Sequence, residues 1–190
     1  LSLSWDHHDN PFTSQNSVGV YPGRSYTTVT LWTGLNPLKM AMDDYAYVSG
    51  LLQAEALTDY ITNYRRRMFD SASAIFWMFN DSWPVTHGWT IVDYYRRRKL
   101  AYHPVRRAFQ PVTVVVTEDE GTVTLYGVND TPTPWTGSVR FGLFALSGAR
   151  PIDQTQAVTL PANASTVLAT FPSSEWESRG VKTHGAFAVL

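Results

Sequence analysis

The chain has 190 residues and a formal net charge of −1, which argues against bulk electrostatic attraction to nucleic acid or to an anionic membrane. It contains no cysteine, so disulfide frameworks and thiolate metal sites are excluded, and no apolar run approaches the roughly 20 residues that span a bilayer. Seven Trp and ten Tyr suit a protein that offers aromatic platforms to ring-shaped polar ligands, although aromatic side chains more often fill cores.

Residues 1–43 keep no hydrophobic period and are interrupted by turn-forming Gly and Pro. An irregular run of this length predicts a functional loop or a segment separated from its structural context. His7 and His8 suggest a metal site, but adjacent side chains rarely converge on one ion and no further ligand follows at helical spacing. We therefore expect a polar loop, with no metal and no cofactor.

The clearest helix is predicted over residues 44–69. Its apolar residues recur at intervals of three and four, which places them on one stripe facing a core: Tyr47, Leu51, Ala54, Leu57 or Thr58, Ile61, Tyr64 and Met68. Asp43 and Asp44 at its start and Arg65–Arg67 at its end match the helix dipole, so we interpret these arginines as structural. For Glu55, a buried partner and a solvated side chain both remain open.

Residues 73–79 form an apolar run without helical period, which predicts a strand buried on both faces of a parallel sheet. Parallel strands present ligand-binding groups at their carboxyl ends. This end carries four candidate substrate-binding residues: Trp77, Asn80, Asp81 and Trp83. A buried strand with a capped exit loop explains the same pattern without any ligand.

A loop over residues 80–93 precedes a second helical region. Asp93 is its predicted amino-terminal cap, and Pro104 is expected to kink it or to start a second short helix that ends at Phe109. Arg96–Lys99 is interpreted as a solvated helix face. The expected buried face is apolar: Leu100, Val105, Ala108 and Phe109. The succession of helix, buried strand and helix predicts an α/β barrel.

The pattern changes at Pro111. Six segments rich in β-branched residues alternate in polarity and are separated by turn residues: 112–117, 122–128, 137–145, 156–160, 165–170 and 185–190. They predict an antiparallel, immunoglobulin-like β-sandwich over residues 111–190, with a domain boundary near 109–111. Glu118–Gly121 is the predicted hairpin turn, because its carboxylates lack the spaced oxygen ligands of a calcium loop.

Three segments resemble the end of the catalytic barrel of glycoside hydrolase family 2, closest to its β-mannosidase and exo-β-glucosaminidase-like members: Phe76–Pro84, Trp89–Tyr95 and Ala101–Val112. The first contains Trp-x-x-Asn-Asp-x-Trp-Pro, which these members carry on the eighth strand, and residues 47–67 resemble their seventh barrel helix. The resemblance implies α/β plus all-β parts. Residues 1–110 would be the carboxyl-terminal portion of a (β/α)8 TIM barrel, and an immunoglobulin-like β-sandwich would follow.

The resemblance also implies an activity. Such enzymes are retaining exo-β-glycosidases with two glutamates, an acid/base on the fourth strand and a nucleophile on the seventh. Neither glutamate is expected in this chain, because it has no Asn-Glu pair and the nucleophile's strand precedes Leu1. Trp77 matches the tryptophan that lines the floor of the terminal-sugar pocket, and the peptide bond after it is a candidate cis bond. For Asn80, Asp81 and Trp83, sugar contact and a structural role both remain open, with bracing slightly favoured for Asp81.

Two interpretations follow. In the first, the chain is the carboxyl-terminal piece of a β-mannosidase-like hydrolase of terminal β-linked sugars, and the missing amino-terminal part completes the barrel. Its partner is then carbohydrate, with neither nucleic acid nor membrane involved. In the second, the chain acts alone as a non-catalytic carbohydrate-binding or assembly module. The start at Leu1 favours the first interpretation, and mannose, glucosamine and galactose remain alternatives for the terminal sugar.

Overall fold

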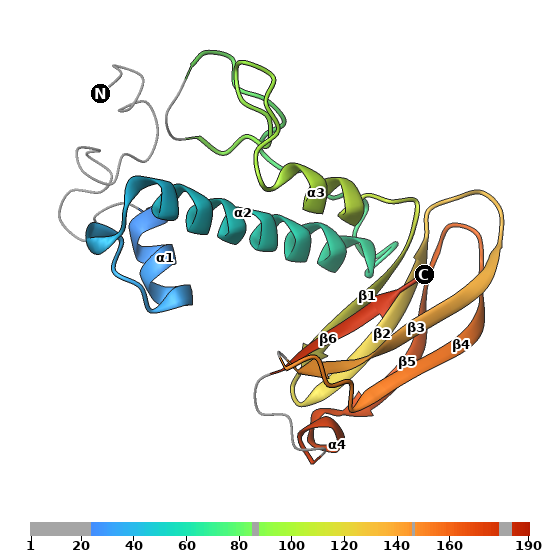
Figure 1. Ribbon diagram of the computed structural model, residues 1–190. Helices are drawn as coiled ribbons and strands as arrows, with labels where there is room; N and C mark the ends of the chain where they lie inside the picture. The colour runs from blue at the N-terminus through green and yellow to red at the C-terminus, as the bar shows by residue number, and fades with distance from the viewer. Residues whose placement is uncertain (1–23, 85–87, 146, 179–183) are drawn as a thin grey trace. The chain divides into compact units, whose positions relative to one another are not determined.

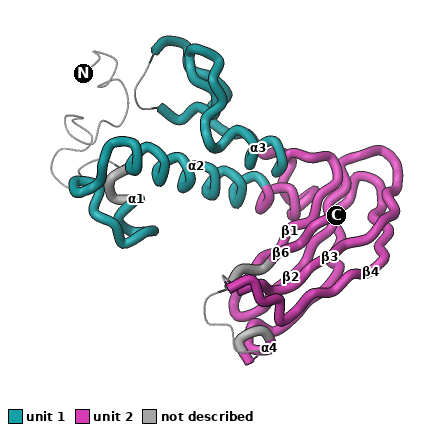
Figure 2. The backbone as a smooth tube through the Cα atoms, viewed as in Figure 1, with its two compact units in different colours: residues 1–61, 75–108 teal, residues 62–74, 109–190 magenta. Residues whose placement is uncertain are grey.

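The computed structural model describes residues 24–84, 88–145, 147–178 and 184–190 (Figure 1). They divide into two compact units (Figure 2), which are described separately below. Unit 1 consists of Leu1–Ile61 and Ile75–Ala108, and unit 2 of Thr62–Ala74 and Phe109–Leu190. The predicted loop around His7 and His8 lies outside the described residues.

The helix predicted over residues 44–69 appears as α2, Met42–Arg65, whose last turn belongs to unit 2. Its first turn carries Asp43 and Asp44 and its last turn Arg65, as the dipole argument required. The buried stripe is narrower than predicted, because Ala54 and Ile61 are buried whereas Tyr47 and Leu51 are exposed, as is Glu55. Within the described ranges, no helix is long and apolar enough to cross a membrane.

Two further elements of unit 1 fall in the stretch for which the sequence predicted no regular structure. Helix α1 spans Arg24–Thr33, and the 3-10 helix η3 spans Pro37–Lys39. The residues of α1 are largely Thr, Ser, Val, Tyr and Trp, which have modest helix propensity. Neither the helix propensity nor the hydrophobic period of this stretch therefore indicated α1.

The prediction of a buried strand over residues 73–79 is wrong for this structure. The segment is assigned no strand, and Ile75, Trp77 and Phe79 are exposed. Its end pairs in parallel with a neighbouring segment at Asn80 and Val92. A strand is defined by hydrogen bonds to its neighbours, and apolar composition alone cannot supply them.

The helix predicted to start at Asp93 is also wrong. The Asp93 N–H donates to the Arg97 carbonyl and the Arg96 N–H to the Asp93 carbonyl, each at 2.9 Å, which closes a turn instead. Arg96 has a φ of 65°, in the left-handed region, and this interrupts any helix. Burial raises the pKa of Asp93, but hydrogen bonds from the backbone and guanidinium of Arg97 outweigh this effect and hold that pKa below its ordinary value.

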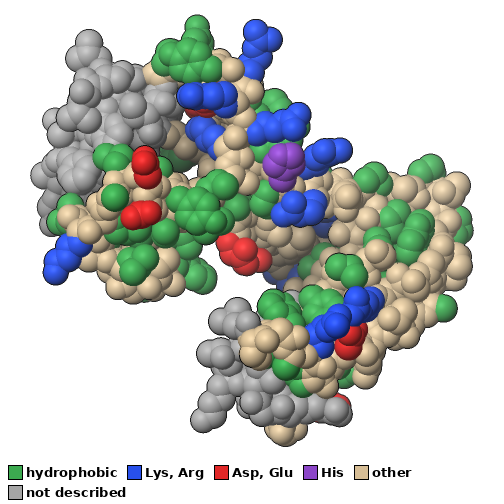
Figure 3. Space-filling view, viewed as in Figure 1, with side chains coloured by type: hydrophobic (Ala, Val, Ile, Leu, Met, Phe, Trp, Pro, Cys, Tyr) green, Lys and Arg blue, Asp and Glu red, His purple; other side chains and the backbone are tan. Residues whose placement is uncertain are grey.

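The second part of that region is a helix, as predicted. Helix α3 spans Tyr102–Ala108 and places Pro104 in its first turn, where the missing N–H has no intrahelical acceptor to lose. Val105 and Ala108 are buried, whereas Leu100 and Phe109 are exposed. Figure 3 shows basic side chains gathered on the visible face of unit 1. Five arginines between residues 96 and 107 are exposed: Arg96, Arg97, Arg98, Arg106 and Arg107.

Unit 2 contains the predicted antiparallel sandwich. Its two three-stranded sheets have the orders β1-β2-β5 and β4-β3-β6. All six predicted strands are confirmed: β1 Val112–Asp119, β2 Thr122–Asn129, β3 Trp135–Ala145, β4 Ile152–Leu160, β5 Ala164–Pro172 and β6 His184–Val189. A short helix, α4 (Ser173–Glu177), follows β5 and was not predicted.

The core of the sandwich lies between its two sheets. One buried cluster combines residues of β2, β3 and β4: Leu125, Val139, Phe141, Val158 and Leu160. The predicted turn between β1 and β2 is confirmed, since Asp119 pairs with Thr122 around Glu120 and Gly121. Both central residues have positive φ, 47° and 76°, as the tightest hairpin connection requires.

Candidate functional site

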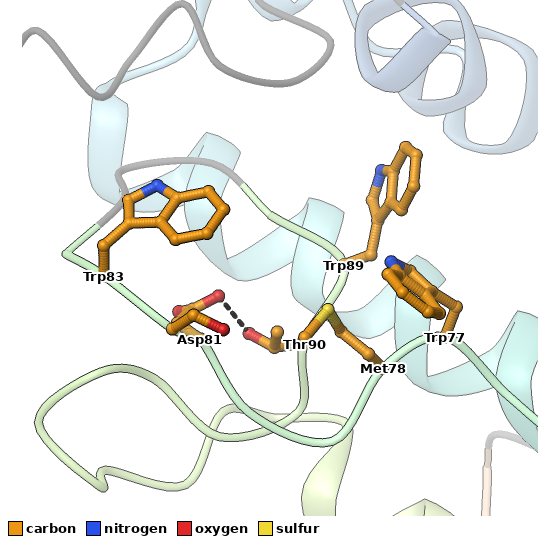
Figure 4. Close-up of a pocket in the computed structure, with 7 residues that line it drawn as sticks. Trp77, Met78, Asp81, Trp83, Trp89 and Thr90 are labelled. Carbon is orange, nitrogen blue, oxygen red and sulfur yellow. Dashed lines mark hydrogen bonds between the residues drawn. The ribbon is translucent and has the colours of Figure 1, made fainter.

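A small cavity in unit 1 brings three tryptophans together (Figure 4). Its volume is about 20 Å³, room for about one water molecule. The lining residues are Trp77, Met78, Asp81, Ser82, Trp83, Trp89 and Thr90. A sugar ring cannot enter a space of this size.

Two segments without regular secondary structure meet here because their backbones are hydrogen-bonded. The N–H of Val92 donates to the carbonyl of Phe79 at 2.9 Å, and the N–H of Asp81 donates to the carbonyl of Val92 at 3.1 Å. This pairing sets residues 77–83 beside residues 89–92. The peptide bond between Trp77 and Met78 is cis, as the family resemblance implied.

The indoles lie at the surface. Trp77 is 68% exposed, and Trp83 and Trp89 are also exposed. Figure 4 shows Trp83 on one side of the hydrogen bond between Asp81 and Thr90, and Trp77 with Trp89 on the other. Exposed aromatic rings grouped around a cavity are typical of a ligand-binding surface.

Asp81 lies beneath these rings and is almost completely buried. Its Oδ1 accepts a hydrogen bond of 2.7 Å from the hydroxyl of Thr90, and its Oδ2 lies 3.4 Å from Nζ of Lys99. The Lys99 ammonium also donates to the Thr90 hydroxyl at 2.6 Å. Each of these contacts joins two groups of the protein.

The structure brings three of the four predicted site residues to the cavity: Trp77, Asp81 and Trp83. Asn80 is not among the lining residues; its amide donates to the carbonyl of Asp81 at 3.2 Å. Trp89 and Thr90, which also line the cavity, were not predicted as site residues. Trp89 is the first residue of the second segment that resembles the family, and this position could have indicated that it belongs to the site.

The carboxylates at this surface are few. The lining residues among the described ones include one carboxylate, Asp81, and neither a glutamate nor a histidine. Retaining glycoside cleavage uses two carboxyl groups about 5–5.5 Å apart. The described residues also contain no group of His, Asp and Glu side chains that could hold a metal ion.

Comparisons with known proteins support the resemblance. Residues 121–188 match the Mannosidase Ig/CBM-like domain family. Beta-mannosidase B of Thermothelomyces thermophilus is 37% identical over 81 residues, and that of Aspergillus niger is 38% identical over 78 residues. Each match covers 40% of this chain and 9% of the relative.

Solved structures that are similar to this chain include enzymes of the same kind. The β-D-mannosidase of Dictyoglomus thermophilum has a TM-score of 0.70 and 29% identity, over 78% of this chain and 18% of that one. An exo-chitosanase of Amycolatopsis orientalis has a TM-score of 0.54 at 19% identity, over 77% of this chain and 19% of that one, and it shows likeness of fold alone. This chain thus matches only a small part of each relative's length. The sequence and structural matches together make the chain similar to a part of β-mannosidases, in agreement with the resemblance found in its sequence.

Proposed function

We propose that this chain forms part of a retaining exo-β-glycosidase that hydrolyses terminal β-linked sugars. In this proposal the chain supplies the wall of the sugar pocket on the eighth barrel strand. It supplies neither of the two catalytic glutamates. The observation that carries the proposal is the surface formed by Trp77, Trp83 and Trp89 over a cavity too small for a sugar. A flat indole suits the C–H face of a pyranose, whose hydroxyls then point toward polar groups at the ring edge.

The proposed domain organisation places the end of a (β/α)8 barrel in residues 1–110 and the sandwich domain in residues 111–190. Its support in unit 1 is the segment before Asn80, which has exposed apolar side chains at alternate positions: Ile75, Trp77 and Phe79. Exposed apolar side chains on a segment without a paired neighbour are expected where further strands would pack. The rest of the barrel, from other residues of the same protein, would supply those strands.

A β-mannoside is the first candidate substrate, because the relatives at 29–38% identity are named as β-mannosidases. Trp77 is the proposed pocket floor. Asp81 contacts the protein through Thr90 and Lys99, so its proposed part is support of the surface. Trp83 is a proposed second aromatic contact, and Asn80 a candidate hydrogen-bonding partner at the pocket rim.

The test uses the complete protein that contains this chain, assayed with an aryl β-mannoside. Trp77→Ala should lower kcat/KM by about 10- to 100-fold, since burying an aromatic side chain against a ligand contributes about 1.5–3 kcal/mol. Trp32→Ala is the matched control, because Trp32 is 71% exposed on α1 and does not line the cavity. Equal activities of the two variants would contradict the proposed role of Trp77.

The isolated chain of 190 residues should not hydrolyse the same substrate, because its aromatic surface carries only one carboxylate. Turnover by the isolated chain that Trp77→Ala abolishes would contradict the proposal. Sugar binding without turnover in the complete protein would instead support a carbohydrate-binding module, for which the exposed Trp77 is the favouring observation.

A further inference from the structure

We infer that Asp81, Thr90 and Lys99 form a positioning network that holds the indoles of Trp83 and Trp89 in the arrangement a sugar ring requires. Thr90 and Lys99 are then positioning residues, which act on the ligand through Trp83 and Trp89. That the ligand is a sugar rests on the proposed function, whereas the network itself is seen in the hydrogen bonds of Asp81, Thr90 and Lys99.

The hydroxyl of Thr90 is the centre of the network. It donates to Oδ1 of Asp81 at 2.7 Å and accepts from Nζ of Lys99 at 2.6 Å, which uses both capacities of one hydroxyl group. Thr90 is 2% exposed, so water does not replace these bonds. The carboxylate of Asp81 is also buried, and a buried charge requires a partner, here the Lys99 ammonium at 3.4 Å.

Each member of the network is tied to a tryptophan-bearing segment. Thr90 directly follows Trp89, and Asp81 lies two residues before Trp83. The backbone N–H of Lys99 donates to the carbonyl of Ile91 at 2.9 Å, and Nε2 of Gln53 donates to the carbonyl of Trp89 at 2.8 Å. The segment that carries Trp89 is therefore fastened through its backbone to α2 and to residue 99, and through Thr90 to Asp81.

This arrangement predicts a specific kinetic signature. Stacking against an indole strengthens substrate and transition-state binding alike, so a misplaced indole raises KM and leaves kcat nearly unchanged. Thr90→Val keeps the shape of the side chain and removes the hydroxyl, which breaks both bonds at once. Thr90→Ser keeps the hydroxyl.

The experiment compares these variants of the complete protein with an aryl β-mannoside as substrate. Thr90→Val should raise KM about tenfold with kcat within about twofold of the wild type, and Thr90→Ser should retain most of the wild-type KM. Thr155→Val, an exposed position on β4, is the matched control and should change neither constant. An unchanged KM in Thr90→Val, or equal impairment in Thr90→Ser, would overturn the inference.

A second readout does not depend on turnover. The near-ultraviolet circular dichroism of tryptophan reports indole packing, so Thr90→Val should change it and Thr155→Val should not. If Thr90→Val fails to fold, Lys99→Met provides the same test, because it removes the ammonium of a partly exposed side chain. If the wild-type protein leaves the aryl β-mannoside intact, a β-mannoside is excluded as its substrate. The network is then decided by the dichroism alone, and an unchanged spectrum of Thr90→Val overturns it.

Discussion

Nη2 of Arg65 lies 2.6 Å from Oδ2 of Asp130, and Nε of the same guanidinium donates to that oxygen at 3.1 Å. Both residues belong to unit 2, and Asp130 directly follows strand β2. The guanidinium of the next arginine, Arg66, lies 5.3 Å from the ring centre of Tyr126. These contacts support the structural interpretation of Arg65 and Arg66.

Replacing Arg65 and replacing Asp130 should lower the free energy of unfolding by different amounts. The side chain of Arg65 is 7% exposed and that of Asp130 is 38% exposed. Asp130→Ala leaves a buried cation and should lower the free energy of unfolding by about 2–3 kcal/mol, whereas Arg65→Met leaves a hydrated carboxylate and should cost about 1 kcal/mol. Denaturant titration of unit 2 measures both values, and equal losses would refute the asymmetry.

The ion pair of Arg140 and Asp153 should make the stability of the sandwich depend on pH. Arg140 donates to the two carboxylate oxygens at 2.7 and 2.6 Å. These hydrogen bonds hold the pKa of Asp153 below its ordinary value; burial raises that pKa less, and the positive charges of Arg140 and Arg150 lower it further.

Because the folded state lowers this pKa, the pair stabilises fully above the unfolded pKa of about 3.9, and its contribution is lost as pH falls toward the lower folded value. The stability difference between wild type and Asp153→Asn should therefore shrink below about pH 4. Urea unfolding from about pH 6 to pH 2.5 tests this. In an Arg140→Met background most of this pH dependence should disappear, and a difference that is constant with pH would refute the assignment.

The sandwich was predictable from sequence because the alternation of apolar and polar residues in each strand indicates which of its faces is buried. In β2, Val123 and Leu125 are buried whereas Thr122 and Thr124 between them are less so, which is the period-two signal of a half-buried strand. The apolar segment at 73–79 carries no such period in its sequence. Its apolar run indicates that partners are needed, but sequence alone does not state which segments provide them.

The candidate site was predictable only in part, for a related reason. Trp77, Asp81 and Trp83 follow one another on a single segment, so local reasoning placed them together. Thr90 and Lys99 reach Asp81 through backbone pairing of residues 89–92 and through the turn at Asp93, which the sequence suggested to be a helix start. Lys99 was therefore interpreted as one cation of a solvated run.

Gly142 in β3 should tolerate no side chain. A Cβ built on Gly142 would overlap the backbone carbonyl oxygen of Ile152 on the paired strand β4. Backbone cannot move aside as a flexible side chain does, so Gly142→Ala should destabilise unit 2 by more than about 3 kcal/mol. Ser138→Ala, at an exposed position on the same strand, is the control and should change stability by less than about 0.5 kcal/mol in the same titration.

Asn129 should be the most sensitive polar residue at the end of the sandwich. It is fully buried, and its Nδ2 donates to the carbonyls of Thr133 at 2.9 Å and Pro161 at 3.0 Å. Its Oδ1 accepts from the N–H and the hydroxyl of Thr131, at 2.9 and 2.7 Å. Removing the amide leaves several buried groups unpaired, so Asn129→Ala should cost about 2–4 kcal/mol.

Asn129→Asp separates the donor role from the acceptor role. The new carboxylate can still accept from Thr131, but it turns a second oxygen toward backbone carbonyls and buries a charge, so it should cost at least as much as Asn129→Ala at neutral pH. Folding then disfavours the charged form and raises the pKa of the introduced carboxyl. The destabilisation should therefore decrease as pH falls below that raised pKa, because the protonated acid regains a donor. Unfolding midpoints at about pH 7 and pH 4 measure this, and a penalty that grows on acidification would exclude the donor role.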